Sequence, residues 1–123
     1  MISDQDALRV IAVAIDRLGV LCRGLDRTGF VEKFEKDWVF AAAVSFQLVQ
    51  IGELVSGMMS GGRGGRERDA VPVSGHPEVD WQGFVDLSET LLDSPPRVTP
   101  GPVWQQIEVE LPTLVQAIRG LVR

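Results

Sequence analysis

Apolar residues recur along the first part of the chain at steps of three and four, the spacing that gathers side chains on one side of an α-helix. The pattern extends from about residue 3 to 23, and Ser3 precedes the acidic Asp4 and Asp6, as a residue that caps a helix does. Its apolar positions are Leu8, Ile11, Ile15, Leu18 and Leu21 or Cys22. We therefore expect an amphipathic helix at the start of the chain.

A second and longer pattern begins near Phe30 and continues to about Met58, after Gly24, Gly29 and the polar residues between them interrupt the first. Thr28 is placed to cap this second helix. Its apolar stripe comprises Phe34, Trp38, Ala41, Val44 or Ser45, Leu48, Ile51 and Val55. The sequence predicts one long helix, in which the alanines at 41–43 permit a close helix neighbour.

Glycine and arginine dominate the next segment, which has no apolar periodicity and extends over about residues 60–76. Because glycine loses much backbone entropy on ordering, we expect a flexible connecting loop here. A phosphate-binding loop is the alternative interpretation of glycines mixed with Arg63, Arg66 and Arg68. We favour the connector, since no Gly-Lys-Ser/Thr follows and no strand precedes.

Two more helical patterns complete the chain. One runs from about Asp80 to the pair Pro95-Pro96, which should end it, and carries Trp81, Phe84, Leu87, Leu91 and Leu92. The other opens at Pro100 and Pro102 and carries Val103, Ile107, Leu111, Leu114, Ile118 and Leu121, with Pro112 expected to kink it or to start a new turn. The patterns predict an all-α fold, a four- to five-helix and predominantly up-and-down bundle.

Composition narrows the class of protein. A length of 123 residues fits one domain spanning 1–123, and 45% hydrophobic residues suffice for a core. The net charge of -5 offers no basic field for nucleic acid, and one cysteine with one histidine gives neither an internal disulfide nor a zinc ligand set. Because the N-terminal residues are acidic and we find no apolar run of about 20 residues, we expect a cytoplasmic protein without a membrane span.

Several short motifs stand in a defined order along these helices. They are Phe34-x-x-Asp37, Ala43-Val44, Leu48-x-x-Ile51-Gly52-Glu53, Asp80-Trp81-x-x-Phe84, Val103-Trp104 and Leu111-Pro112-x-x-Leu114. In order and spacing they resemble the HEPN superfamily, in the DUF86 or HepT-like branch, whose best-known members are toxins encoded beside a minimal nucleotidyltransferase. The resemblance covers nearly the whole chain and implies a HEPN-like helical bundle.

Active HEPN ribonucleases carry an Arg-x4-6-His motif on the third helix, written Arg-Asn-x-x-x-His-x-Tyr in this branch. Counting from Trp81 forward and from Trp104 back places the four motif positions on Ser88, Glu89, Asp93 and Pro95. None of the four keeps the residue of the family. The resemblance therefore implies a degenerate motif with no catalytic residue at these positions.

Metal-independent RNA cleavage requires a group that exchanges a proton near neutral pH and a cation beside the developing phosphorane charge. Glu89 and Asp93 stand one helical turn apart, and two negative charges there repel a phosphate. We expect no enzyme, no cofactor and no nucleic-acid partner. The alternative is a ribonuclease toxin that uses the substituted residues Asp93, Glu89 and Arg97, although Pro95-Pro96 should remove Arg97 from the helix.

Other residues with reactive or binding side chains receive structural interpretations. A hard cation could bind the three carboxylates of Asp86, Glu89 and Asp93. The simpler interpretation is a solvated acidic face or the lining of a dimer groove. His76 is expected as an exposed loop residue and not as a base, and Cys22 as a small packing residue. We expect the tryptophans to pack in the core; they are Trp38, Trp81 and Trp104.

The resemblance also implies partners. HEPN domains form homodimers in which the two third helices meet around a cleft, and in this branch the nucleotidyltransferase modifies a tyrosine with AMP. This chain has no tyrosine, and we consider Ser94 as a substitute. The expected function is a protein-interaction or regulatory module, a toxin–antitoxin relic that binds a nucleotidyltransferase. A small-molecule pocket between the helices is a further alternative.

Overall fold

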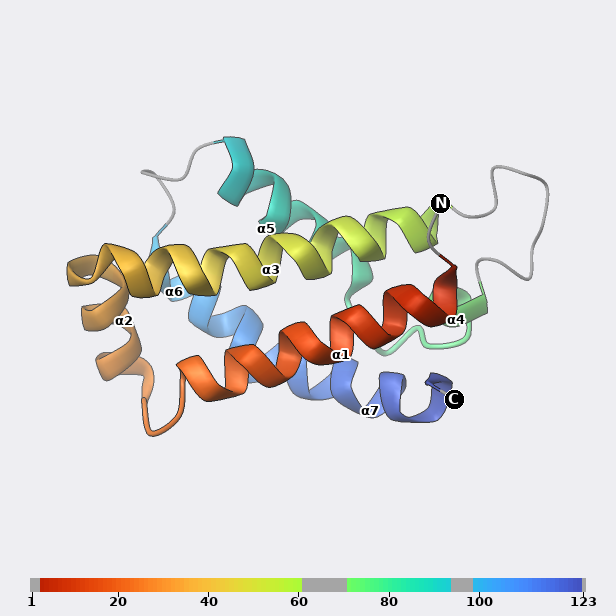
Figure 1. Cartoon of the computed structure of the whole chain (residues 1–123), viewed down its shortest axis with the longest axis horizontal. Helices are drawn as coiled ribbons and strands as arrows, with labels where there is room; N and C mark the ends of the chain where they lie inside the picture. Colours follow the sequence, from red (N-terminus) through yellow and green to blue (C-terminus); the bar gives the residue numbers. More distant parts are fainter. Residues whose placement is uncertain (1–2, 61–70, 94–98, 123) are drawn as a thin grey trace.

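The computed structural model describes residues 3–60, 71–93 and 99–122, and within these ranges every regular element is helical (Figure 1). The elements in chain order are α1 (Asp4–Leu21), α2 (Arg27–Lys36), α3 (Trp38–Met59), α4 (Val71–Ser74), α5 (Trp81–Asp93), α6 (Pro100–Gln105), the π-helical segment η4 (Gln106–Glu110) and α7 (Leu111–Leu121). If α6, η4 and α7 are counted as one continuous helix and the four-residue α4 is set aside, the described residues form five helices that pack against one another. The predicted all-α fold is confirmed.

The central element is α3, which packs along α1 and α5 and also contacts α2 and α4. Figure 1 shows α1 and α5 running antiparallel to α3, while α6 and α7 run in the direction of α3. α7 packs against α1, and α6 packs against α2. This alternation of directions confirms the predominantly up-and-down arrangement. One apolar core forms between the helices, and its fully buried large side chains include Leu8, Ile11, Leu18, Phe30, Leu48, Ile51, Met58, Phe84 and Leu114.

The first helix follows its predicted pattern closely. The Ser3 hydroxyl accepts a hydrogen bond from the Asp6 backbone N–H at 3.1 Å, and Asp4 and Asp6 stand in the first turn. Negative side chains there complement the positive end of the helix dipole. The last residue in α1 is Leu21, and Gly24 adopts a left-handed backbone with φ of 77° just beyond it. Glycine adopts this conformation without steric cost, so the chain turns sharply toward α2.

The predicted long second helix is wrong in two respects. Asp26, and not Thr28, caps α2, because its carboxylate accepts from the Gly29 N–H at 2.7 Å. The chain then leaves the helical conformation at Asp37, whose backbone is extended at φ −112° and ψ 96°. The Asp37 carboxylate accepts from the Phe40 N–H at 3.1 Å and starts α3 as a separate helix. Aspartate is among the strongest N-caps, so two aspartates decide both boundaries.

Part of the predicted flexible loop over residues 60–76 is helical. Residues 61–70, which include Arg63, Arg66 and Arg68, lie outside the described residues. Val71–Ser74 form the short helix α4, and the partly buried Val73 packs against the core. Through this apolar contact, part of a segment that we expected to be flexible takes a fixed place beside α3.

Pro112 divides the last helix, as the sequence predicts. Proline has no N–H, so a helix that passes through Pro112 lacks the bond to the carbonyl four residues before it. The preceding residues widen into the π-helical η4, in which the Leu111 N–H donates to the Gln106 carbonyl, and α7 begins at Leu111. The apolar face continues through the break, with Val103, Leu111, Leu114 and Ile118 buried.

The helix α3 has the length and composition of a membrane-crossing helix, with Glu53 as its one charged residue. The expectation that no apolar run approaches membrane length is therefore wrong for α3. The core helix of a bundle has the same properties, and the buried side of α3 packs on α1 and α5.

Candidate functional site

Ser88, which the resemblance would place at the ribonuclease arginine, is buried between two helices. Ser88 is 3% exposed, and its hydroxyl donates to the Val85 carbonyl at 2.7 Å. Opposite it stands Gly52 of α3, where an added Cβ would collide with the Ser88 side chain and lie 2.6 Å from the Phe84 carbonyl oxygen. Gly52 therefore lets α5 approach the backbone of α3 closely. Of the three alanines at 41–43, Ala42 is exposed, whereas Ala41 and Ala43 are partly buried.

The other two described motif positions face solvent. Glu89 and Asp93 are exposed on the outer side of α5 together with Asp86, whose carboxylate accepts from the Gln82 amide at 2.9 Å. Within residues 3–60, 71–93 and 99–122, none of these three carboxylates forms an ion pair, and no cluster of His, Cys, Asp and Glu has a metal-binding arrangement. Pro95, Ser94 and Arg97 lie outside the described residues.

His76 holds the turn before α5 in place. Its backbone carbonyl accepts from the Trp81 indole N–H at 2.9 Å, and its Nδ1 lies 2.9 Å from a carboxylate oxygen of Glu78. The hydrogen bond with His76 lowers the pKa of the Glu78 carboxyl. The His76 side chain is 28% exposed, so the prediction of an exposed loop residue is right about the loop and overstates the exposure.

Cys22 lies half-buried at the edge of the core, beside the C-terminal end of α1. Burial raises the pKa of its thiol, and the nearby positive charge of Lys33 offsets part of that rise. A thiol with a raised pKa is a poor nucleophile at neutral pH. The geometry agrees with the predicted packing role.

Aromatic rings join α2 to the rest of the bundle. Phe30 is fully buried, and its ring centroid lies 5.0 Å from Trp104 and 5.6 Å from both Phe34 and Phe40. The ammonium group of Lys33 stands 4.8 Å from the centre of the Phe40 ring, at a distance typical of a cation–π contact. An open hollow on the outer side of α2 is lined by residues of that helix alone, so it is a surface depression and not a pocket between helices.

The three tryptophans do not share one environment. Trp81 and Trp104 are buried, as predicted, whereas Trp38 is 80% exposed and the prediction of core packing is wrong for it. The break at Asp37 explains the difference, because α3 starts at Trp38 with its own rotation instead of continuing the apolar stripe of α2.

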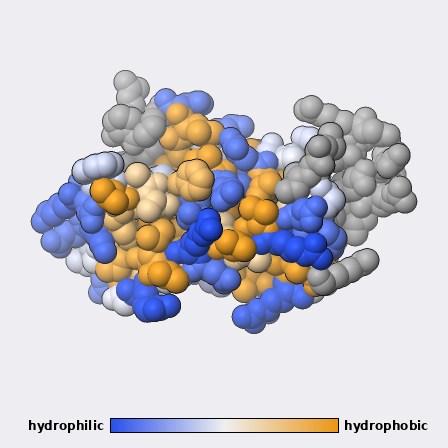
Figure 2. Space-filling model, viewed as in Figure 1, coloured by the Kyte–Doolittle hydropathy of each residue, from blue (hydrophilic) through white to orange (hydrophobic). Residues whose placement is uncertain are grey.

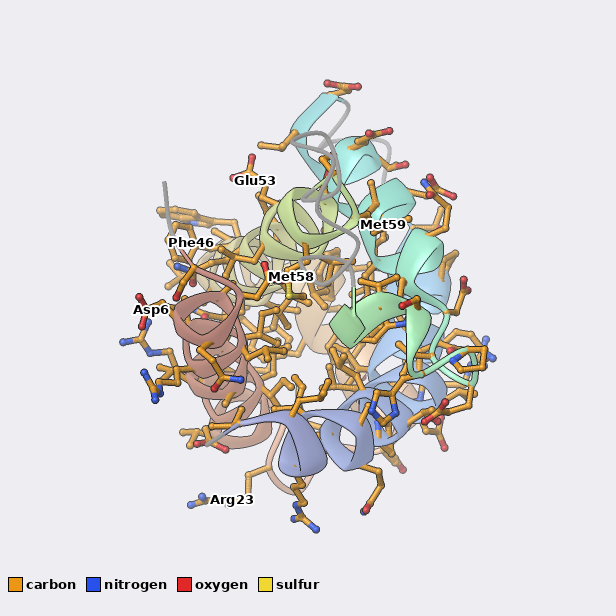
Figure 3. The ribbon with its side chains drawn as sticks, turned by 90° about the vertical axis from the view of Figure 1, so that its right-hand side faces the viewer. Asp6, Arg23, Phe46, Glu53, Met58 and Met59 are labelled. Carbon is orange, nitrogen blue, oxygen red and sulfur yellow. The ribbon has the colours of Figure 1, made fainter. Side chains whose placement is uncertain are left out.

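Exposed apolar side chains gather on the outer face of α3. We define this face by Trp38, Val39, Ala42, Phe46 and Glu53, all exposed. Positions 38, 42, 46 and 53 are separated by steps of four, four and seven, which keeps them on one side of a helix. Figure 3 shows Phe46 and Glu53 projecting outward while Met58 points into the interior, and Figure 2 shows hydrophobic side chains on the face of the molecule over α3 and α1.

No signal of helical periodicity alone identifies this face. The sequence pattern is apolar on almost every side of α3, so the exposed side could be found only after the neighbours of α3 were placed. Comparison of the chain with models of protein families, with curated proteins and with solved structures finds no match.

Proposed function

We propose that the chain is a catalytically inactive, HEPN-like helical domain that works by binding proteins through the outer face of α3. The observation that carries the proposal is the exposure of Trp38, Val39 and Phe46 on that face. Single exposed apolar residues are common on protein surfaces, but a contiguous apolar patch with two aromatic residues is typical of a protein interface. Tryptophan in particular is enriched among the residues that dominate binding energy.

The outer face of α5 supports a role without catalysis. Ser88 is engaged with the Val85 carbonyl and packed beside Gly52, and the exposed Glu89 and Asp93 bring negative charge where RNA cleavage requires positive charge. A phosphate approaching this face meets like charge. Ribonuclease activity through α5 therefore has less support than protein binding through α3.

The family resemblance implies two kinds of protein partner, a second copy of the chain and a nucleotidyltransferase. A toxin–antitoxin relic would bind the second of these. Both are proteins, and both fit an apolar contact face better than they fit the acidic face of α5.

Capture experiments with matched variants test this proposal. The tagged chain is compared with Phe46→Lys on the outer face of α3 and with Val109→Lys on η4, because Val109 is 47% exposed and Phe46 is 59% exposed. Each variant adds the same charge to a surface residue. We expect a purified candidate nucleotidyltransferase, or the untagged chain itself, to bind the original chain and Val109→Lys at least about 30-fold more tightly than Phe46→Lys.

Equal binding of both proteins to all three forms, or no binding to either, would contradict the proposal. An RNA cleavage assay tests the alternative activity directly. Cleavage of total RNA by the purified chain, abolished in Asp93→Ala and kept in Asp86→Ala, would replace the proposal with a ribonuclease that uses substituted residues.

A further inference from the structure

The helix α2 is attached to the bundle by few contacts. It stands across one end of the molecule, between the end of α1 and the start of α3 (Figure 1). Phe30 is its one buried residue, whereas α1 and α5 each bury five. In the described part of the chain, no ion pair or side-chain hydrogen bond joins α2 to another helix. Phe30 is therefore the main anchor of α2, with the partly buried Phe34 beside it.

The backbone leaves the helical conformation on both sides of α2. Before it stands Gly24, whose φ of 77° makes it the one residue with a left-handed backbone among those that the structure describes. After it stands Asp37, which is extended at φ −112° and ψ 96°. Hinges are commonly a few residues at the ends of elements that absorb a change in backbone angles. The chain thus has a possible hinge at each end of α2, while α1 and α3 keep their own packing.

Trp104 of α6 supplies an independent observation. It is 8% exposed, and its indole Nε1 is buried without a hydrogen-bond partner. Outside its own continuous helix, α6 packs chiefly on α2, and the ring centroid of Phe30 lies 5.0 Å from that of Trp104. An indole N–H can only donate, and a buried donor without an acceptor destabilises the arrangement that buries it. The packing of α2 therefore covers a donor that an oxygen atom would satisfy.

We propose that α2 opens as a unit and uncovers a binding site for an aromatic ring that bears an oxygen acceptor, such as a ketone. The ring takes the place of Phe30, against Trp104 and against the edge of Phe40, whose ring lies 5.6 Å from Phe30 at an angle of 70°. The oxygen of the ligand accepts from the Trp104 N–H. A ligand that binds only the open form shifts the protein toward it. The site uses the buried side of α3 at Phe40, so it is separate from the outer face in the proposed function.

Hydrogen exchange of the full chain, followed by NMR at each amide, tests the opening. We expect the amides of α2 to exchange at least about 100-fold faster than the buried amides of α1 and α3, because a helix with few buried apolar contacts opens at a lower free energy than the whole bundle. Phe30→Leu should speed exchange by the same factor, about tenfold, at every amide of α2. Equal protection of α2 and α3 overturns the inference. An increase confined to one end of α2 also overturns it, because that is fraying and not opening as a unit.

Phe84→Ala is the matched control for the same experiment, because Phe84 is as deeply buried as Phe30 but lies on α5. It should speed exchange in α1 and α3 by at least about 50-fold and leave α2 within about twofold, since the Phe84 contacts persist when only α2 opens. Ile11→Val, a milder change at a fully buried site of α1, should give the same pattern with a factor of about three to ten. Exchange of α2 that rises in step with that of α1 overturns the inference, because α2 would then open only when the whole protein unfolds.

Binding of acetophenone tests the ligand class, and toluene is the matching probe without an oxygen acceptor. The chain has three tryptophans, so Trp104→Phe identifies the Trp104 indole signal in proton–nitrogen NMR spectra. We expect acetophenone to shift that signal and to bind Phe30→Ala at least about tenfold more tightly than the original chain, because the variant leaves the ring site empty. No shift of the Trp104 signal in either form overturns the proposed site.

The role of the indole N–H needs a comparison that cancels the different hydrophobicity of the two probes. In the Phe30→Ala background, the ratio of acetophenone affinity to toluene affinity, followed through backbone amide signals, should fall at least about fivefold when Trp104→Phe is added. Phenylalanine keeps a ring at position 104 but has no N–H to donate. A ratio that does not change overturns the proposed hydrogen bond and with it the requirement for an oxygen acceptor.

Discussion

The outer faces of α3 and α5 lie on neighbouring helices that meet closely at Gly52 and Ser88, yet their chemistry is opposite. The face of α5 presents Asp86, Glu89 and Asp93 to water, whereas the face of α3 presents two aromatic rings and one carboxylate. The solvent side of a helix is normally polar, and α5 follows that rule. The exception is α3, and the exception is the better guide to function because an exposed apolar face usually has a partner.

The largest expected difference in stability is between two tryptophan substitutions, one on α5 and one on α3. Trp81→Ala on α5 should lower the free energy of unfolding by about 4 kcal/mol, since it empties a buried site and removes the bond to the His76 carbonyl. Trp38→Ala on α3 should change it by less than about 0.5 kcal/mol, because that ring is exposed. Urea unfolding measures both. A similar loss in the two variants would refute the assignment of Trp38 to the surface.

The contact between the two helices gives the next effect. Gly52→Ala places a Cβ against Ser88 and the Phe84 carbonyl oxygen, and the backbone part of that clash cannot move away. We expect a loss of about 3 kcal/mol in the free energy of unfolding. Gly57→Ala on the same helix is the matched control, since nothing lies within 4 Å of its added Cβ, and it should stabilise the protein by up to about 1 kcal/mol. Destabilisation by both would mean that the loss does not come from the contact with α5.

The caps of α3 and α5 should contribute smaller and nearly equal amounts. Asp37 accepts from the Phe40 N–H and Asp80 from the Gly83 N–H, both at 3.1 Å. Replacing either by alanine should cost about 1 kcal/mol of unfolding free energy in thermal or urea unfolding. Asp86→Ala, on the outer face of α5, should cost less than about 0.5 kcal/mol. If Asp37→Ala had no effect, the separate start of α3 at Trp38 would lose its explanation.

The smallest effect is a pH dependence located in the turn before α5. The hydrogen bond with His76 lowers the pKa of Glu78 from its ordinary value of 4.5. A carboxyl whose pKa is lower in the folded state stabilises the protein above pH 4.5 and loses that contribution as the pH falls through the lower, folded value. Glu78→Gln should therefore flatten the acid side of the stability curve. Urea unfolding between about pH 3 and 6 measures this change, because carboxyl groups ordinarily titrate in that range.

Helical periodicity was sufficient for the fold class and for most of the core. The stripes through Leu8, Ile11 and Leu18 and through Leu111, Leu114 and Ile118 are buried as predicted. Pro112 marked the change from η4 to α7, and Ser3 marked the start of α1, because both act through local backbone chemistry. The same local chemistry was available at Asp26 and Asp37, where the wrong boundary came from extending an apolar stripe past a capping residue.

The candidate sites depended on tertiary contacts that periodicity does not contain. Ser88, counted as the arginine position of a nuclease, is buried because Gly52 of α3 lies against it. Glu89 and Asp93 share one side of α5, as the sequence indicated, because residues four positions apart lie together on a helix whatever packs against it. The exposure of Trp38 and Phe46 depends on which side of α3 is covered by α1 and α5.

By itself the sequence determined that this chain is helical, where most of its helices begin and end, and that Asp86, Glu89 and Asp93 make α5 acidic. These properties follow from interactions between residues a few positions apart. Only the tertiary structure decided which side of the apolar helix α3 stays uncovered, since α3 is apolar on nearly every side and its neighbours come from distant parts of the chain. The proposed binding face is therefore a property of helix packing, because burial depends on what lies opposite a side chain and not on the side chain alone.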